Sequence, residues 1–342
     1  GLFSPSFALD DPRLGIMIKG LGIAFEVLTW LVIFVWARRW RGFRAASLVT
    51  LAYAWNPALV FDVAYWGQPD SIHSFFILLS ILLLVERKPK LSWLFLAAAA
   101  FVKPQAWVFL PLVALLTLWR SGPRALGQGI AVGLGTSLVL VAPFLLQGTF
   151  RELMSLPRQV YGAMPFLSSN AHNLWWLYSS GPPFIADDGM VDFLSYRNIG
   201  FLLLGASYGF ALWRTRGRLG GPATLGVAAF VGFSFFMLPT RVHENHMFMV
   251  FPLLALALAG EARLRWVYGI LSVTFLANMA LHDPPLAAAF WMKAAQPYWE
   301  PLQVANSILN TAALLAWALA LRGKGGVGRQ RRQMSETAQI ST

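Results

Sequence analysis

Polar and aromatic side chains are concentrated in three short corners that separate apolar stretches of the sequence. The corners span residues 65–73, 101–106 and 239–246. Each combines basic, carboxylate, amide or aromatic groups, which suit a phosphate and the hydroxyl groups of a sugar. We expect the three corners to lie at one face of a membrane and to converge on a site for an anionic, lipid-linked substrate.

The first corner contains Asp70, which directly precedes an apolar helix. One interpretation is an N-cap, whose side-chain oxygen accepts hydrogen bonds from free backbone N–H groups. The other is a catalytic carboxylate that removes a proton from an acceptor hydroxyl. The neighbouring Gln68 and Trp66 favour the second interpretation, because an amide and an aromatic ring suit the two faces of a sugar. His73 fits either the site or a packed core position.

Lys103 stands between two apolar segments in the second corner. An ionisable side chain at that depth is costly, which makes it a functional candidate. We expect it to bind a phosphate or pyrophosphate, with Gln105 at the start of the next helix nearby. The alternative is that the lysine snorkels towards outer water.

The third corner places Arg241, His243, Glu244 and His246 within six residues. Guanidinium matches phosphate geometry, so we expect an anion site of Arg241 with one or both histidines. Glu244 joins Asp70 as a candidate catalytic carboxylate on the acceptor side. A metal site is not predicted, because no clear third ligand follows from the sequence. A solvated loop is the remaining alternative.

Two further candidates, His172 and Asn173, precede a pair of tryptophans in the long segment 147–197. Histidine and asparagine at this place could contact a sugar. A re-entrant loop packed against the rest of the protein explains them equally well.

The composition identifies the kind of scaffold that must position these residues. The 342 residues are 57% hydrophobic and only 12% charged, whereas soluble domains carry about 25% charged residues. We therefore predict an all-α, polytopic membrane protein. The net charge of +12 follows from a basic cytoplasmic side, so no nucleic acid is expected as a partner. The absence of cysteine excludes thiol catalysis and disulfides.

A hydrocarbon core of roughly 30 Å needs about 20 apolar helical residues. On this basis we predict about eleven spans: 15–37, 46–64, 72–86, 91–102, 104–119, 126–146, 198–213, 222–238, 247–260, 266–282 and 302–321. Most basic residues fall in alternate breaks, at 38–44, 87–90, 120–124, 214–218, 263–265 and 322–332.

The positive-inside rule places these basic breaks in the cytoplasm and all three polar corners outside. Residues 1–321 are predicted to form one transmembrane domain with a long outer loop at 147–197. Residues 322–342 are predicted to be a basic, disordered cytoplasmic tail.

Two stretches resemble a known family: "NPALVFDVAYWGQPDSIHSFFILLSILLL" and "LAAAAFVKPQAWVFLPLVAL". Together with "LPTRVHENHMFMVFPLLALAL", they are similar to membrane glycosyltransferases of the GT-C fold. The most similar members that we can name are prokaryotic relatives of the second mannosyltransferase of GPI-anchor assembly. The sequence departs from the family pattern at Asn245-His246, where Arg-Tyr is usual.

The resemblance implies a GT-C-like mannosyltransferase of the plasma membrane. It would use a polyprenyl-phosphate sugar, without a further cofactor, and act on a glycan or lipid acceptor at the outer face. The family carries a key aspartate in its first outer loop, which would lie before Gly1; we therefore expect an N-terminally truncated chain.

On this interpretation the sugar is transferred by direct displacement, with inversion at its anomeric carbon. We assign Lys103, Arg241 and His243 to the phosphate, and Gln68, Gln105 and His172 to the sugar. A transporter or flippase of lipid-linked sugars is the main alternative, and a non-enzymatic scaffold is a second one.

Overall fold

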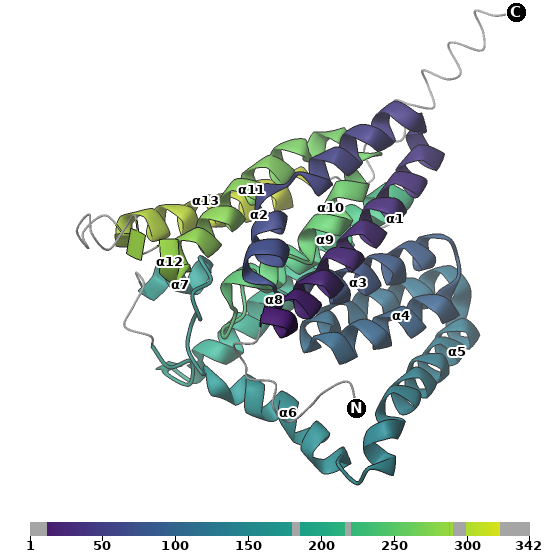
Figure 1. The fold of residues 1–342 in the computed structure, drawn as a ribbon, viewed down its shortest axis with the longest axis horizontal. Helices are drawn as coiled ribbons and strands as arrows, with labels where there is room; N and C mark the ends of the chain where they lie inside the picture. Colours follow the sequence, from purple (N-terminus) through teal and green to yellow (C-terminus); the bar gives the residue numbers. More distant parts are fainter. Residues whose placement is uncertain (1–11, 180–184, 216–219, 287, 290–298, 322–342) are drawn as a thin grey trace, which may run out of the picture.

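The computed structural model describes residues 12–179, 185–215, 220–286, 288–289 and 299–321 (Figure 1). Nearly all regular structure in these ranges is helical. The exception is a small antiparallel hairpin in which β1 (Met190–Val191) pairs with β2 (Leu194–Ser195). The predicted all-α class is therefore confirmed. The predicted tail, residues 322–342, lies outside the described residues.

The helices occupy the predicted apolar segments and add several short elements between them. The main helices are α1 (Pro12–Ala54), α3 (Asp70–Val85), α4 (Pro89–Val102), α5 (Leu110–Leu146), α6 (Phe150–Ala163), α8 (Tyr196–Thr215), α9 (Gly221–Met237), α10 (Val250–Leu258), α11 (Arg265–His282) and α13 (Trp299–Ala320). The short ones are α2 (Pro57–Val60), α7 (Leu174–Ser179), α12 (Pro284–Leu286), the π-helix η1 (Phe61–Trp66) and the 3-10 helices η2 (Pro104–Phe109), η3 (Glu244–Met247) and η4 (Ala262–Leu264).

Within the described residues, four helical stretches are long and apolar enough to cross a membrane by themselves. They are Gly15–Ala54, Pro104–Leu146, Ala262–His282 and Pro301–Ala320. This finding supports a membrane-embedded protein. Crossing of the membrane by all eleven predicted spans stays a prediction.

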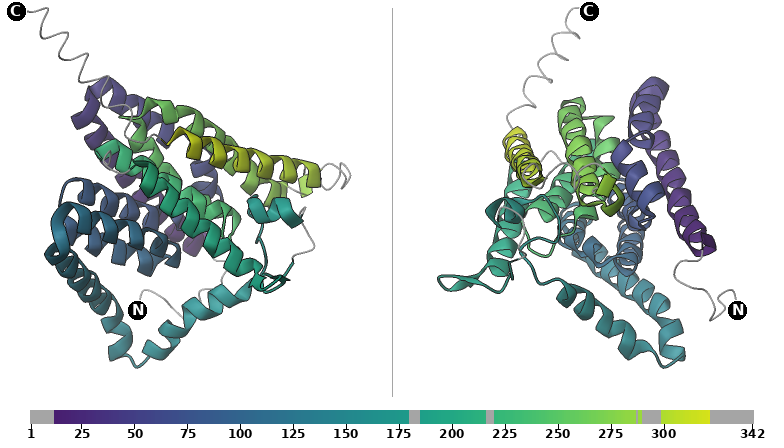
Figure 2. Two further views of the ribbon diagram at one scale, coloured as in Figure 1. Left: turned by 180° about the vertical axis from the view of Figure 1, so that it is seen from behind. Right: turned by 60° about the vertical axis from the view of Figure 1, so that its left-hand side comes forward.

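Two of the long helices change direction sharply at a glycine. Gly42 in α1 and Gly122 in α5 have φ angles of 79° and 82°, a region that favours glycine because it has no Cβ atom. In α1 the two arms lie side by side, since the hydroxyl of Tyr53 donates to the Glu26 carboxylate across 3.0 Å (Figure 2). Helix α1 thus contains the predicted span 15–37 and the first part of the predicted span 46–64, which continues through α2 and η1.

The core of the protein is formed by α9 and α10, which lie at the centre of the bundle (Figure 1). Both helices carry apolar residues on all sides, and nearly all side chains of the two helices are buried. A helix that is hydrophobic all round belongs in the interior. Helices α1, α3, α11 and α13 pack around this centre.

Alternate breaks between the helices lie at opposite ends of the bundle. At the basic end, Arg41 donates to the Gly260 carbonyl, Arg214 to Leu321 and Arg263 to Ala320. The three polar corners meet at the other end, as described below. This alternation matches the predicted order of the breaks, and the assignment of the basic end to the cytoplasm stays a prediction.

The contact between α4 and α5 gives a direct test of this packing. An added Cβ at Gly129 would lie 2.4 Å from the Trp93 ring, whereas a Cβ at Gly135 would meet no atom within 4 Å. We expect Gly129→Ala to lower the free energy of unfolding by about 1–3 kcal/mol, as overpacking does. Gly135→Ala, on the same helix, should leave it unchanged or slightly raised. Thermal unfolding of the two variants in detergent checks this difference, and equal melting temperatures would contradict the packing.

Candidate functional site

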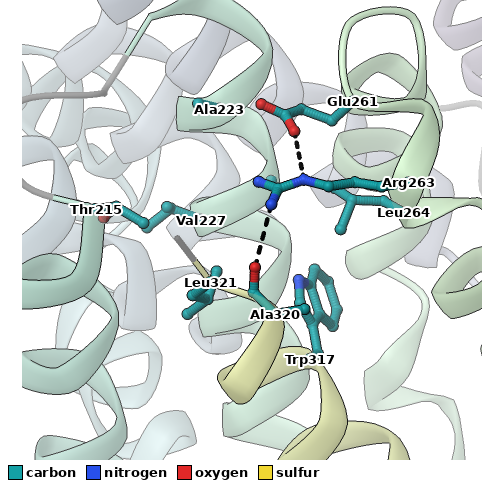
Figure 3. Close-up of a pocket in the computed structure, with 10 residues that line it drawn as sticks. Thr215, Ala223, Val227, Glu261, Arg263, Leu264, Trp317, Ala320 and Leu321 are labelled. Carbon is teal, nitrogen blue, oxygen red and sulfur yellow. Dashed lines mark hydrogen bonds and ion pairs between the residues drawn. The ribbon is translucent and has the colours of Figure 1, made fainter. Parts of the chain in front are cut away.

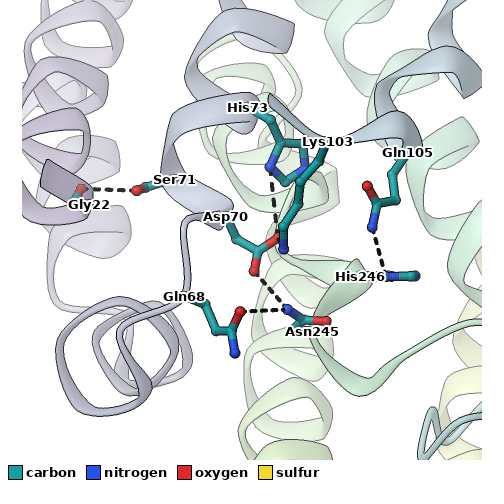
Figure 4. Close-up of polar contacts among 9 residues, drawn as sticks. All are labelled: Gly22, Gln68, Asp70, Ser71, His73, Lys103, Gln105, Asn245 and His246. Carbon is teal, nitrogen blue, oxygen red and sulfur yellow. Dashed lines mark hydrogen bonds and ion pairs between the residues drawn. The ribbon is translucent and has the colours of Figure 1, made fainter. Parts of the chain in front are cut away.

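The three polar corners converge on the Asp70 carboxylate (Figure 4). Its Oδ1 accepts a hydrogen bond from Lys103 Nζ at 2.7 Å, and its Oδ2 accepts one from Asn245 Nδ2 at 2.8 Å. The same Asn245 amide lies 3.5 Å from Gln68 Oε1. Asp70, Lys103 and Asn245 come from the first, second and third corners, so the predicted convergence is present in the structure.

Local backbone features bring the first two corners together. Gly67 ends the π-helix η1 with a φ angle of 78°, which turns the chain towards the start of α3. Lys103 has an extended conformation between α4 and η2, as residues before proline prefer. This break directs the Lys103 side chain to Asp70 instead of continuing the helix.

Asp70 is not the N-cap of α3, which was one of its two predicted roles. Pro69 occupies that position, and no side chain caps the helix. The carboxylate is only 1% exposed and forms an ion pair with Lys103. His73 is buried beside it, with its Nδ1 3.8 Å from Asp70 Oδ1. That distance is too long for a hydrogen bond, so His73 fits the packed position better.

The histidines of the third corner are neutral at neutral pH. Burial lowers the pKa of His243 and lowers that of His246 well below its usual range. The Nε2 atom of His246 lies 2.9 Å from the amide nitrogen of Gln105. This contact joins the second corner to the third. As neutral groups, His243 and His246 can each donate and accept a hydrogen bond, and their part in an anion site stays a prediction.

Glu244 differs from Asp70 in its surroundings. Its Oε2 is buried and has no hydrogen-bond partner among the described residues, while burial raises the pKa of the carboxyl group. A carboxylate with a raised pKa is a stronger base than an ordinary one. Glu244 is thus a buried carboxyl group next to Asn245, without a side-chain partner for its Oε2 atom in the described part of the chain.

Arg241 is engaged by protein groups. Its Nε and Nη2 donate to the two oxygens of Asp187 at 2.7 and 2.8 Å, and Nη1 donates to the Tyr161 carbonyl at 2.8 Å. The hydrogen bonds to Asp187 raise the pKa of the guanidinium. The structure therefore shows Arg241 holding the segment 147–197 to the third corner through Asp187 and Tyr161, and its contact with phosphate stays a prediction.

His172 and Asn173 lie in a separate, buried polar cluster. His172 Nε2 is 3.0 Å from His282 Nε2, and its Nδ1 is 2.8 Å from the Asn306 amide. Asn173 accepts hydrogen bonds from the backbone N–H groups of Trp175 and Trp176, at the start of α7. Both side chains pack the segment 147–197 against the bundle. This agrees with the alternative interpretation, and their contact with a sugar stays a prediction.

Trp66 forms its hydrogen bond with a residue outside the three corners. Its indole N–H donates to Asp283 Oδ2 at 2.8 Å, and Asp283 follows α11. The indole N–H is therefore occupied, and a contact with sugar through the ring face stays untested.

Several residues of this region were not singled out from the sequence. Asn245 is the most important, because it contacts both Gln68 and Asp70. Asp62 in η1 is fully buried, and neither carboxylate oxygen has a partner among the described residues. Asp62 could have been identified from the sequence, because an acidic residue inside an apolar segment is a functional candidate. Asn306 and Asn310, four residues apart on α13, carried a similar signal.

An apolar groove with a volume of about 430 Å³ adjoins the third corner. Helices η2, α6, α8 and α9 form it, with Trp107, Val108, Phe201, Leu204 and Phe235 among the lining residues. Gln105, Arg241, His243 and His246 line it as well. The groove thus combines a long apolar surface with polar groups of the site.

A smaller cavity of about 100 Å³ lies at the basic end (Figure 3). Arg263 there donates to Glu261 at 2.7 Å and to the Ala320 carbonyl at 3.2 Å. No predicted site residue lines this cavity, and its charged groups pair with each other. We therefore place the candidate site at the opposite end.

No family model matches the sequence, and no curated protein matches it significantly. Among the described residues, no three His, Asp or Glu side chains are grouped to hold a metal ion.

Proposed function

We propose that this protein is an integral membrane glycosyltransferase that moves a sugar, mannose in our hypothesis, from a polyprenyl-phosphate donor to an acceptor hydroxyl at the outer face. The observation that carries the proposal is the meeting of three polar corners beside an apolar groove. A lipid-linked sugar has the same division into an apolar chain and a polar, anionic head.

In this proposal the groove holds the isoprenoid chain, because its lining is mostly aromatic and aliphatic. The phosphate lies near Lys103, whose side chain is 17% exposed while its partner Asp70 is buried. Neutral His243 and the Gln105 amide offer hydrogen bonds at the polar part of the groove. The cation stabilises the charge that develops on the departing phosphate.

The transfer is a single displacement. The acceptor oxygen forms a bond to the anomeric carbon while the bond from that carbon to the phosphate oxygen breaks. The bonding electron pair leaves with the polyprenyl phosphate, and the acceptor proton passes to a carboxylate. Glu244 is our first choice for this base because of its raised pKa, and Asp70 orients Lys103 and Asn245.

A flippase for lipid-linked sugars would need polar groups along the whole path between the two ends. The central helices α9 and α10 are instead apolar along nearly their full length, and the site polar groups gather at one end. This distribution favours transfer over transport. Convergence of the three corners also speaks against a scaffold without activity.

The test is sugar transfer by the intact protein in proteoliposomes, with polyprenyl-phosphate mannose and extracted lipid or glycan acceptors. We expect Glu244→Gln to reduce transfer by about 10²–10⁴-fold, the usual range for a lost general base. Glu152→Gln, an exposed change on α6, serves as the matched control and should retain activity. Movement of labelled lipid across the bilayer without sugar transfer would overturn the proposal in favour of the flippase.

A further inference from the structure

Helix α6 has two chemically different faces. At 100° per residue, its large apolar side chains share one face: Phe150, Leu153, Met154, Leu156, Pro157, Val160 and Tyr161. The opposite face carries Arg151, Glu152, Ser155, Arg158 and Gln159. An amphipathic helix of this kind normally covers its apolar face.

The described helices of the bundle do not cover the apolar face of α6 in this way. None of the residues of α6 is buried, and Val160 is 69% exposed. Figures 1 and 2 show α6 standing away from the central helices, beyond the end of α5. An exposed apolar face of this size marks an interaction surface.

The ends of α6 are fixed at the level where a membrane surface is expected. The helix begins at Phe150, shortly after a candidate membrane span ends at Leu146. At its other end, Arg241 donates to the Tyr161 carbonyl and stacks on the Tyr161 ring at 4.2 Å. The helix is therefore held beside the candidate site, at the end of the bundle opposite the basic breaks.

We propose that α6 lies in the interface of the bilayer, with its apolar face among the acyl chains and with Arg151 and Arg158 at the phosphates of anionic lipids. Amphipathic helices with basic residues beside an apolar face bind membrane surfaces in this way. A second copy of the chain is a poorer fit, because a stable interface uses roughly 20–30 residues from each side and this face offers seven.

Helix α6 also forms one wall of the apolar groove. Pro157 and Val160 line it from the α6 side, facing Trp107 and Phe201. With α6 in the interface, the groove opens sideways into the bilayer, and lipid can enter it without passing through water. This inference concerns the contact with lipid and does not depend on the proposed sugar transfer.

The absence of cysteine from the chain allows a direct test with single-cysteine variants. Met154→Cys and Val160→Cys place a fluorescent label on the apolar face, whereas Ser155→Cys and Gln159→Cys place it on the polar face. Each labelled protein is reconstituted in nanodiscs of phosphatidylcholine with phosphatidylglycerol. Quenching is measured with lipids that carry a nitroxide near the glycerol backbone, and with aqueous iodide.

We expect nitroxide quenching to be at least about threefold stronger at positions 154 and 160 than at 155 and 159, and iodide quenching to show the reverse order. Protection of 154 and 160 from both quenchers would mean that a protein segment covers the face, and would overturn the proposal. Equal exposure of all four positions to iodide would overturn it as well.

The charge contribution is tested with Arg151→Gln/Arg158→Gln in the Val160→Cys background. Removing phosphatidylglycerol should weaken nitroxide quenching of the parent and leave this double variant unchanged, because its attraction to anionic lipid is lost. An equal lipid dependence of both proteins would contradict the role of the arginines. Circular dichroism and melting temperature show whether the variants remain folded.

Discussion

Replacement of Lys103 by alanine is expected to lower the free energy of unfolding by about 3–5 kcal/mol, because it leaves a buried charge without its partner. The Asp70 carboxylate is 1% exposed and forms a 2.7 Å ion pair with Lys103. Asn245 would remain as a neutral donor, which cannot replace a cation. Under the proposed function, the same substitution also abolishes sugar transfer.

The stability effect and the functional effect can be separated. Lys103→Met combined with Asp70→Asn removes both charges and should recover most of the lost stability, since an uncharged pair of similar volume is tolerated. Transfer should stay absent if Lys103 holds the phosphate. Lys90→Ala, at an exposed position, is the control and should change neither property.

Melting curves in detergent and the transfer assay together decide the outcome. Unchanged stability of Lys103→Ala would contradict the buried ion pair. Recovery of transfer in the Lys103→Met/Asp70→Asn variant would show that the lysine acts only on folding, and the phosphate would then need another ligand.

Replacement of Arg241 by alanine is expected to be comparably severe, with a loss of about 3–5 kcal/mol. Asp187 is fully buried and accepts two of the three hydrogen bonds that the guanidinium donates. Thr240 also donates to this carboxylate at 2.8 Å, so Arg241 and Asp187 hold the segment 147–197 to the third corner. We expect the damage to concentrate in residues 147–197, which should be cleaved faster by proteases.

Arg241→Lys keeps the charge but loses the two-pronged geometry, so its stability should fall between those of the parent and the alanine variant. The exposed Arg265 supplies the control, and Arg265→Ala should melt like the parent. A stable Arg241→Ala protein whose only defect is a raised KM for the donor would contradict the structural role of Arg241 and support its contact with phosphate.

Arg241 and Lys103 show how the sequence can identify a residue and still leave its role undecided. Both residues were predicted to bind phosphate, and both lie in the polar corners where the sequence predicts the site. The structure gives Arg241 a buried carboxylate 54 positions earlier in the chain, whereas Lys103 keeps partial exposure beside the site. No pattern in the sequence connected Arg241 to Asp187.

The sequence by itself determined the helical class, the positions of the apolar segments and the places where they break. These properties follow from local physics, because apolar length and the residues at a break act over a few neighbouring positions. The Lys103-Pro104 break and the three polar corners were recognisable for the same reason.

Only the tertiary structure decided which polar groups pair and which remain available. Asn245 reaches Asp70 across 175 positions, and His172 finds its partners on α11 and α13. The neutral state of His243 and His246 and the raised pKa of Glu244 likewise follow from burial. Pairing and burial depend on how distant segments pack together, and local sequence patterns do not encode that packing.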